Sequence, residues 1–402
     1  MTNFWRVLFL SLLAAFPPLS TDMYLPAIPM LQERWGIGLF LANFTLIIYF
    51  GTFSLFLLVH GPLSDRVGRR PVLLAGIVLF ILGTLGCAMS PGIWTLIAAR
   101  AVQAAGAAAA AALGLALSKD YYQGAERQRI LAIMGVIVGL APMSAPTLGS
   151  LILQFASWRF IFTAQALVGA VALAGALLMT EPEFQRTTGG LGAVAGRYLV
   201  LLRNRRYMGY TMAFSVVNLP MFAFVAASAD LYITHFGLSE QAYGLYFGAN
   251  ALGVMSGSFL CTRLTRHFNA RQILIGSLVG MLLSAVALIL LSGLPSPLAL
   301  AAPMAVMGVF LGASRPISNY VVLEQVDRDV GAASSVLTFV IFLMGALGMA
   351  ATSLNWADKQ AVVGWLAIPS TVLPLAAVWL LSRGDAPAAS SLPPPQGPPR
   401  SA

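Results

Sequence analysis

The chain has 402 residues, of which 58% are hydrophobic and only 9% are charged. A water-soluble domain carries roughly 25% charged residues, so this composition excludes one and predicts a chain whose solvent is lipid. The net charge of +9 does not indicate nucleic-acid binding, because the basic residues are spread over many short loops and form no basic domain. We therefore expect an all-α polytopic membrane protein.

Twelve apolar runs are each long enough to form a membrane span, which needs about 20 residues. Their approximate limits are 6–28, 40–61, 71–90, 93–117, 130–153, 159–180, 208–231, 242–262, 272–292, 298–320, 331–354 and 362–382. The first run lacks a small-residue cleavage site, so we interpret it as a span and not as a signal peptide.

The longest internal polar stretch, 181–207, follows the sixth run. It predicts a cytoplasmic linker between an N-terminal six-helix half, 1–180, and a C-terminal six-helix half, 208–383. The tail 384–402 is rich in Pro, Ala and Ser, and we expect it to be disordered and cytoplasmic.

The distribution of Lys and Arg sets the orientation of the predicted spans. With the N-terminus in the cytoplasm, all but five of the 23 basic residues fall on the cytoplasmic side. The exceptions are Arg34, Arg159 and Lys359 outside, and Arg100 and Arg315 within spans. This bias predicts that both termini are cytoplasmic in a multi-pass protein of a bacterial inner membrane.

Two segments of the chain repeat weakly after about 200 residues. The triplet that starts at Asp22, late in the first span, matches the triplet that starts at Asp230, late in the seventh. The loop 61–70 aligns with 261–270, where Arg266 meets Arg66. We therefore expect two pseudo-symmetric six-helix halves with a central cavity between them.

A glycine- and arginine-rich loop, GPLSDRVGRRP, joins the second and third spans. Its glycines permit close approach and a tight turn, its aspartate can cap a helix, and its arginines hold it at an anionic membrane face. The residues that we single out are Gly61, Asp65, Arg66, Gly68, Arg69 and Arg70. A plain basic loop that only sets topology is the alternative.

This loop resembles the signature of the major-facilitator transporters, in which it acts as a conformational latch. In span four, RAVQAAG (100–106) is similar to a motif of the drug:proton antiporters, although Ala104 replaces the usual glycine. Span five resembles the antiporter helix at Gly139, Pro142, Pro146 and Gly149. The alternative for span five is ordinary packing of small residues.

Two further segments narrow the resemblance. The string STDMYLP (20–26) and the segment WRFIF (158–162) are similar to the bicyclomycin/chloramphenicol-resistance (Bcr/CflA) branch. The resemblance implies a major-facilitator fold and a monomeric, proton-coupled exporter of small drug-like molecules or metabolites. It does not identify the substrate.

Ionisable residues within a membrane are costly and are therefore functional candidates. We assign proton coupling to Asp22 and Arg100, because a carboxyl group between desolvation and a nearby cation can take up and release a proton. Arg100 should pair with a carboxylate or with backbone carbonyls. The alternatives are an interfacial cap for Asp22 and a structural role for Arg100. Arg315 could simply snorkel towards the interface.

Polar and aromatic residues in mid-span are candidates for lining the substrate cavity. They are Tyr24, Asn43, Tyr49, Gln103, Asn218, Phe222, Asp230 and Asn250. With few fixed charges around it, such a cavity suits a neutral or zwitterionic amphipathic molecule.

The same fold would also support a proton-coupled importer of a nucleoside or sugar, and a sensor without transport is a third alternative. We predict no enzyme, because the sequence shows no nucleophile constellation. We also predict no metal and no cofactor, because Cys87 and Cys261 lie in apolar runs without metal-ligand spacing. The expected partners are a small molecule, protons and lipid.

Overall fold

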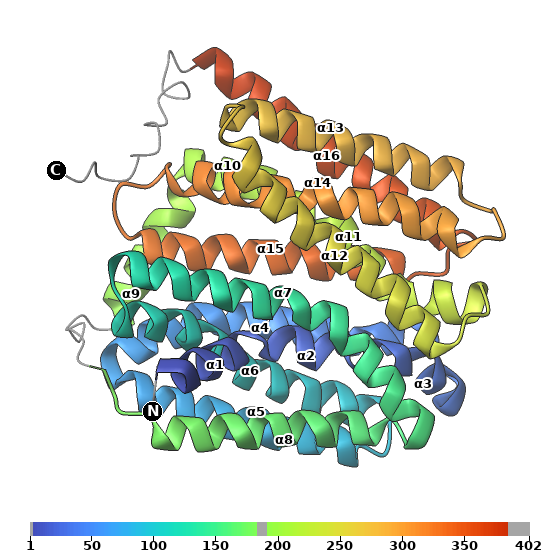
Figure 1. Cartoon of the computed structure of the whole chain (residues 1–402), viewed down its shortest axis with the longest axis horizontal. Helices are drawn as coiled ribbons and strands as arrows, with labels where there is room; N and C mark the ends of the chain where they lie inside the picture. The colour runs from blue at the N-terminus through green and yellow to red at the C-terminus, as the bar shows by residue number, and fades with distance from the viewer. Residues whose placement is uncertain (1–2, 183–190, 385–402) are drawn as a thin grey trace.

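The computed structural model describes residues 3–182 and 191–384, and every regular element in these two ranges is helical. Residues 183–190 of the predicted linker and 385–402 of the predicted tail lie outside the described ranges. Figure 1 shows long, roughly parallel helices in which α1–α8 occupy one side of the bundle and α10–α16 the other.

The N-terminal side begins with a broken first span and continues with five long helices. Its elements are α1 (Asn3–Ala14), α2 (Phe16–Asp22), η1 (Leu25–Ala27), α3 (Ile28–Trp35), α4 (Leu39–Val67), α5 (Arg69–Met89), α6 (Ile93–Tyr121), α7 (Gly124–Phe155) and α8 (Arg159–Leu178).

The C-terminal side follows a helix of the linker and also begins with a broken span. Its elements are α9 (Leu191–Arg203), α10 (Arg205–Ser215), η2 (Val216–Asn218), α11 (Leu219–Ala229), η3 (Asp230–His235), α12 (Glu240–Leu264), α13 (Ala270–Leu290), α14 (Pro297–Leu323), α15 (Val330–Thr352) and α16 (Lys359–Gly384).

Ten helices of the described ranges are long and apolar enough to cross a membrane, and an eleventh span results if the bent N-terminal pair counts as one. The predicted span 242–262 coincides in sequence with α12, whose 25 residues extend about 37 Å, but α12 is not among these ten. Helix α12 packs against both α7 and α14.

The first span is not the continuous helix that we predicted. Phe4–Ala14 and Phe16–Trp35 meet at an angle of 47°. Pro17 and Pro18 stand at the start of α2, where they remove backbone N–H donors and clash with the preceding turn, so the helix breaks there.

The two sides of the bundle meet along two helix pairs, α4 with α15 and α7 with α12. Glycine keeps the second pair close. A Cβ atom on Gly244 of α12 would lie 2.9 Å from Thr147 Oγ1, and one on Gly248 would lie 3.2 Å from the Met143 carbonyl oxygen. Small residues at helix contacts allow this approach within a membrane.

We call the two ends of the bundle the Asp65 end and the Asp230 end, after a carboxylate that each end carries. Within the described ranges, direct side-chain hydrogen bonds between the two sides lie towards the Asp230 end. Asn43 Nδ2 donates to the Ala226 carbonyl oxygen at 2.9 Å, and Ser150 Oγ donates to the Glu240 carbonyl oxygen at 2.7 Å.

At the Asp65 end the linker helix α9 contacts both sides. Tyr198 Oη donates to the Leu58 carbonyl oxygen at 2.9 Å, and Arg197 Nη1 lies 3.6 Å from Asp329 Oδ1. The two sides are thus joined directly at one end and through α9 at the other.

Candidate functional site

Arg100 on α6 is completely buried and is held by neutral groups. Its Nη1 donates to the Ser20 carbonyl oxygen at 2.9 Å and to Gln103 Oε1 at 2.6 Å. Its guanidinium carbon lies 4.4 Å from the ring centre of Tyr49 and 5.2 Å from that of Tyr24. Of the two expected kinds of partner, the structure has the backbone carbonyl, and ring faces add cation–π attraction.

Gln103, predicted to line the substrate cavity, is fully buried in this structure and accepts a hydrogen bond from Arg100. Its Nε2 donates to Thr84 Oγ1 at 2.9 Å and to Gln165 Oε1 at 2.8 Å. Gln165 Nε2 in turn donates to the Leu19 carbonyl oxygen at 3.1 Å. This fully buried network ties α5, α6 and α8 to the broken first span.

Asp22 ends α2, with 7% of its surface exposed, and accepts a hydrogen bond from Thr21 Oγ1 at 2.8 Å. Among the residues described, no cation lies within the 4.0 Å of an ion pair, and Arg100 is not paired with it. The next residue, Met23, places its carbonyl oxygen against Gly149 of α7, a helix that meets α12 of the other side. Asp22 therefore lies near the contact between the two sides.

Several buried polar atoms on helices of both sides have no hydrogen-bond partner among the residues that the structure describes. They include Tyr49 Oη, Arg100 Nε and Nη2, and both amide atoms of Asn250. Such atoms are rare, and each unsatisfied group costs about 1–3 kcal/mol. They belong to α4, α6 and α12, so both sides of the bundle offer polar groups that can bind a ligand.

Aromatic rings join the two sides beside this polar region. The ring centre of Phe50 lies 5.1 Å from that of Phe222 and 5.5 Å from that of Phe342, while Phe53 lies 5.2 Å from Phe342. Phe222, predicted to line the cavity, instead packs within this aromatic cluster. The cluster is an apolar contact between the two sides of the bundle.

Three other predicted cavity residues are engaged elsewhere. Tyr24 is fully buried and its hydroxyl accepts from Thr45 Oγ1 at 3.2 Å. Asn43 joins the two sides as described above. Asp230 Oδ2 lies 2.6 Å from Lys359 Nζ at the start of α16, so its charge is already compensated at the end of the bundle.

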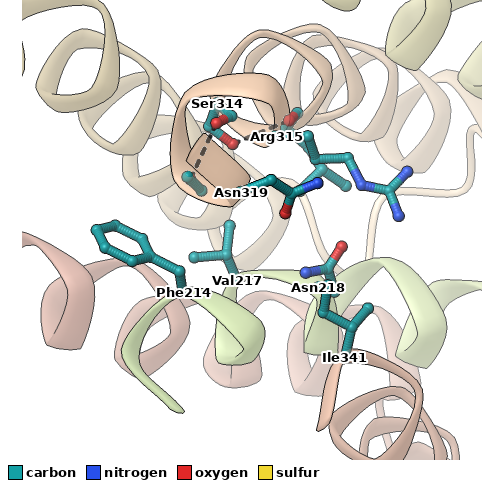
Figure 2. A pocket seen from close by; sticks show the side chains of 9 residues that line it. Phe214, Val217, Asn218, Ser314, Arg315, Asn319 and Ile341 are labelled. Atoms are coloured by element: carbon teal, nitrogen blue, oxygen red, sulfur yellow. Dashed lines mark hydrogen bonds between the residues drawn. The ribbon is translucent and has the colours of Figure 1, made fainter. Parts of the chain in front are cut away.

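Asn218 borders a small cavity between η2, α14 and α15. The cavity has a volume of about 10 Å³, enough for about one water molecule. Figure 2 shows the amide of Asn218 facing that of Asn319 from the opposite segment, with the guanidinium of Arg315 extending to one side.

The predicted latch loop is mostly helical, which corrects its expected structure. Helix α4 continues to Val67, and Gly68 alone separates it from α5. Gly68 has φ +120°, which L side chains rarely adopt, so the predicted tight turn is present. Asp65 lies in the last turn of α4 and caps no helix N-terminus. A Cβ atom on Gly61 would meet nothing within 4 Å, so no close approach explains that glycine here.

Arg69 is the centre of the charges at this turn. It is ion-paired with Asp65, and its Nη1 also donates to Ser64 Oγ at 2.7 Å. Its Nε donates to Asp120 Oδ2 of α6 at 2.8 Å. Arg70 donates to the Leu177 carbonyl oxygen of α8 at 2.7 Å. Arg66 of the same motif is partly exposed. The loop motif alone does not predict the partner Asp120. The signal in the sequence is that a carboxylate stands at the end of span four, the same side of the membrane as the loop.

Helix α7 carries the predicted antiporter residues in one continuous helix, with Pro142 and Pro146 inside it. A Cβ atom on Gly149 would lie 2.0 Å from the Met23 carbonyl oxygen, whereas one on Gly139 would lie 3.4 Å from Met255 Sδ. Gly149 therefore fixes the approach of α7 to the first span, next to Asp22.

Comparisons with known proteins agree with this architecture. The model of the Major Facilitator Superfamily matches residues 10–349. A bicyclomycin resistance protein homolog of Haemophilus influenzae is 28% identical, over 86% of this chain and 88% of that protein. A chloramphenicol resistance protein of Pseudomonas aeruginosa is 27% identical, over 92% of this chain and 90% of that protein.

A likeness among solved structures extends over the whole bundle. The crystal structure of a D-xylose-proton symporter has a TM-score of 0.74 at 14% identity, over 95% of this chain and 97% of that one. At that identity the likeness concerns the fold alone. Because the family model covers most of the chain and the helices have the matching arrangement, the chain belongs to the Major Facilitator Superfamily and is a membrane transporter.

Proposed function

We propose that this transporter exports small drug-like molecules or metabolites in exchange for protons. The observation that carries the proposal is Asp22, a nearly buried carboxyl group near the contact between the two sides, with no cation of the described residues at ion-pair distance. The proton affinity of such a group depends on its access to water and on nearby charge, so it changes when the bundle changes conformation.

Arg100 has a supporting role in this scheme. It is held by a carbonyl and an amide, and its Nε and Nη2 have no hydrogen-bond partner among the described residues. In this scheme a rearrangement of the first span brings these donors and the Asp22 carboxylate together. We expect that approach to accompany proton release, because a cation favours the ionised acid.

The Asp65 end is the cytoplasmic end in this proposal, and both termini lie inside. The support is the bias of Lys and Arg towards loops at that end. With bacterial relatives, the expected location is the inner membrane. Residues 1–180 and 208–383 act as the two moving units around a site within a single chain.

Transport requires the Asp65 end to open and close. The turn at Gly68, with Arg69 bound to Asp65 and Asp120, would steady one conformation, and α9 limits the separation of the two halves at that end. Pro142, Pro146 and the close contact at Gly149 give α7 the shape on which the α12 contact depends.

The proposed substrate is a neutral or zwitterionic amphipathic molecule, of the amphenicol or bicyclomycin kind or of nucleoside size. The aromatic cluster at Phe50, Phe222 and Phe342 offers an apolar wall, and unpartnered groups at Tyr49 and Asn250 offer hydrogen bonds. Two of the relatives are named for resistance to bicyclomycin and chloramphenicol.

Expression in a pump-deficient bacterial strain tests the proposal. We expect raised resistance to at least one compound of this kind, and a protonophore should abolish the gain. Inverted vesicles should accumulate the same compound only with a proton gradient. No change over a broad drug panel, together with growth on a nucleoside or sugar that depends on the protein, would instead establish the importer.

Reporter fusions test the orientation separately. Fusions near residues 64, 123, 195 and 268 should report the cytoplasm. A periplasmic signal from position 195 would contradict the arrangement of two halves around a cytoplasmic linker.

A further inference from the structure

Arg315 is the second arginine within a predicted span, and it is placed differently from Arg100. It lies on α14, eight residues before the helix ends at Leu323, which is about 12 Å from the Asp65 end of that helix. Its side chain is exposed, whereas Arg100 is fully buried. The proposed proton chemistry does not use it.

The exposed guanidinium of Arg315 points into the protein and not towards lipid. Residues on a helix advance by about 100° each, so a residue nine positions away lies on the opposite side. Val306, which is 48% exposed, is therefore opposite Arg315. The neighbouring position, Gly312, contacts the Val254 carbonyl oxygen of α12, the helix that meets α7 between the two halves.

Within residues 3–182 and 191–384, Arg315 has no carboxylate at ion-pair distance and makes no hydrogen bond. A cation in a membrane span is normally paired. Its neighbours are amides: Asn319, one helical turn further along α14, has no hydrogen bond from its side chain. Asn218 keeps its amide oxygen free, since only Nδ2 is used, donating to the Ser215 carbonyl oxygen at 3.3 Å.

These three side chains share the small cavity between η2, α14 and α15 (Figure 2). The two serines of the same wall, Ser314 and Ser318, are bonded to carbonyl oxygens of their own helix and compete little for a ligand. The remaining donors are five N–H groups of a guanidinium and the amide of Asn319. Such a set favours a planar anion that accepts two parallel hydrogen bonds.

We propose that Arg315, supported by Asn319, binds a carboxylate group of the transported molecule at the cavity between η2, α14 and α15. The inference rests on the proposed transport function and changes the expected substrate class from neutral or zwitterionic molecules to amphipathic molecules that carry a carboxylate. The apolar part of the substrate then faces the aromatic cluster, because Ile341 of α15 borders the cavity and Phe342 belongs to that cluster.

The first test measures the electrostatic potential at the cavity between η2, α14 and α15 without any substrate. Cys87 and Cys261 are replaced by alanine, Ile341→Cys supplies the only thiol, and its reaction with an anionic and a cationic methanethiosulfonate reagent is timed. Arg315→Gln should lower the ratio of anionic to cationic rate about tenfold, as expected for removing one nearby charge. Arg315→Lys should keep it. An unchanged ratio in Arg315→Gln overturns the proposal.

The second test compares chloramphenicol with its succinate monoester, which adds one carboxylate to the same scaffold. Binding is measured on the full chain in nanodiscs of zwitterionic lipid. The wild type should bind the ester more tightly than chloramphenicol, and Arg315→Gln should remove about tenfold of ester affinity while leaving chloramphenicol affinity unchanged. Equal loss for both compounds would mean that Arg315 has only a structural role.

A lipid headgroup offers the same anionic chemistry, and the composition of the nanodisc distinguishes this source. If anionic lipid blocks ester binding in the wild type but not in Arg315→Gln, the site takes lipid and the substrate assignment is wrong. Binding of chloramphenicol without preference for the ester overturns only the further inference. A protein that confers no resistance and binds neither compound refutes the proposed function, and the thiol reaction still shows whether Arg315 attracts anions.

Discussion

The charge cluster at the Gly68 turn predicts unequal effects of two substitutions, because its two carboxylates differ in burial. Arg69 is bound to two carboxylates, but the side chain of Asp120 is only 10% exposed and that of Asp65 is 43% exposed. Replacing Asp120 by asparagine should therefore disturb the turn much more than the same replacement of Asp65.

The two losses differ in magnitude. An exposed pair contributes about 0.2–1 kcal/mol, which is the range for Asp65. Breaking a buried pair costs about 3–5 kcal/mol, and we take the lower end for Asp120 because Arg69 keeps Asp65 and Ser64 as partners. We take the case in which the cluster forms in only one of the transporter's conformations. The loss of about 3 kcal/mol in Asp120→Asn then changes the ratio of conformations roughly 100-fold, whereas Asp65→Asn changes it up to about fivefold.

Turnover and affinity, measured separately in vesicles with and without a gradient, test this reasoning. Both variants should slow turnover and leave affinity roughly unchanged, with Asp120→Asn the slower by at least about tenfold. Thermal unfolding in detergent controls for general destabilisation. Equal effects of the two variants, or lost affinity at normal turnover, would refute the assignment of the turn as a latch.

Three further predictions concern other parts of the site. Asp22→Asn fixes a neutral side chain and should abolish gradient-driven accumulation while substrate still binds; normal pumping with an intact pH response would contradict it. Gly149→Val should abolish transport, because even a Cβ atom there would lie 2.0 Å from a carbonyl oxygen of the first span, whereas Gly139→Ala should be tolerated at 3.4 Å from its nearest atom. Asp230→Asn leaves Lys359 without its partner at 2.6 Å and should lower thermal stability. Adding Lys359→Gln should restore part of that loss, and an additive loss in the double variant would show that the pair contributes nothing.

The positions of the spans could be predicted from the sequence because each crosses lipid and must be apolar over about 20 residues. Their ends could not. Helix α4 continues to Val67 through a segment rich in charge and glycine, because Asp65 and Arg69 are satisfied by each other and by Asp120. An apolar run predicts only the part of a helix that lies within lipid, and the helix itself can continue into water.

The site was only partly predictable from the sequence, because residues distant in the chain determine which polar side chains are already hydrogen-bonded. Gln103 looked available, yet Thr84 and Gln165 occupy its amide. His60 lies at the end of the predicted span 40–61, yet it is buried, with Nε2 3.0 Å from the Ala105 carbonyl oxygen. These contacts join different helices, and no spacing along one helix indicates them.

The position of Asp22 also suggests how a proton could be coupled to movement. The next residue, Met23, places its carbonyl oxygen against Gly149 of α7, and the residue after Gly149 donates a hydrogen bond to the Glu240 carbonyl oxygen of α12. Any shift of the first span that follows a change of charge at Asp22 must therefore displace α7 or break this contact. Because that contact joins the two halves at the Asp230 end, we propose that a change of charge at Asp22 acts on that end of the bundle through packed atoms and without touching the substrate.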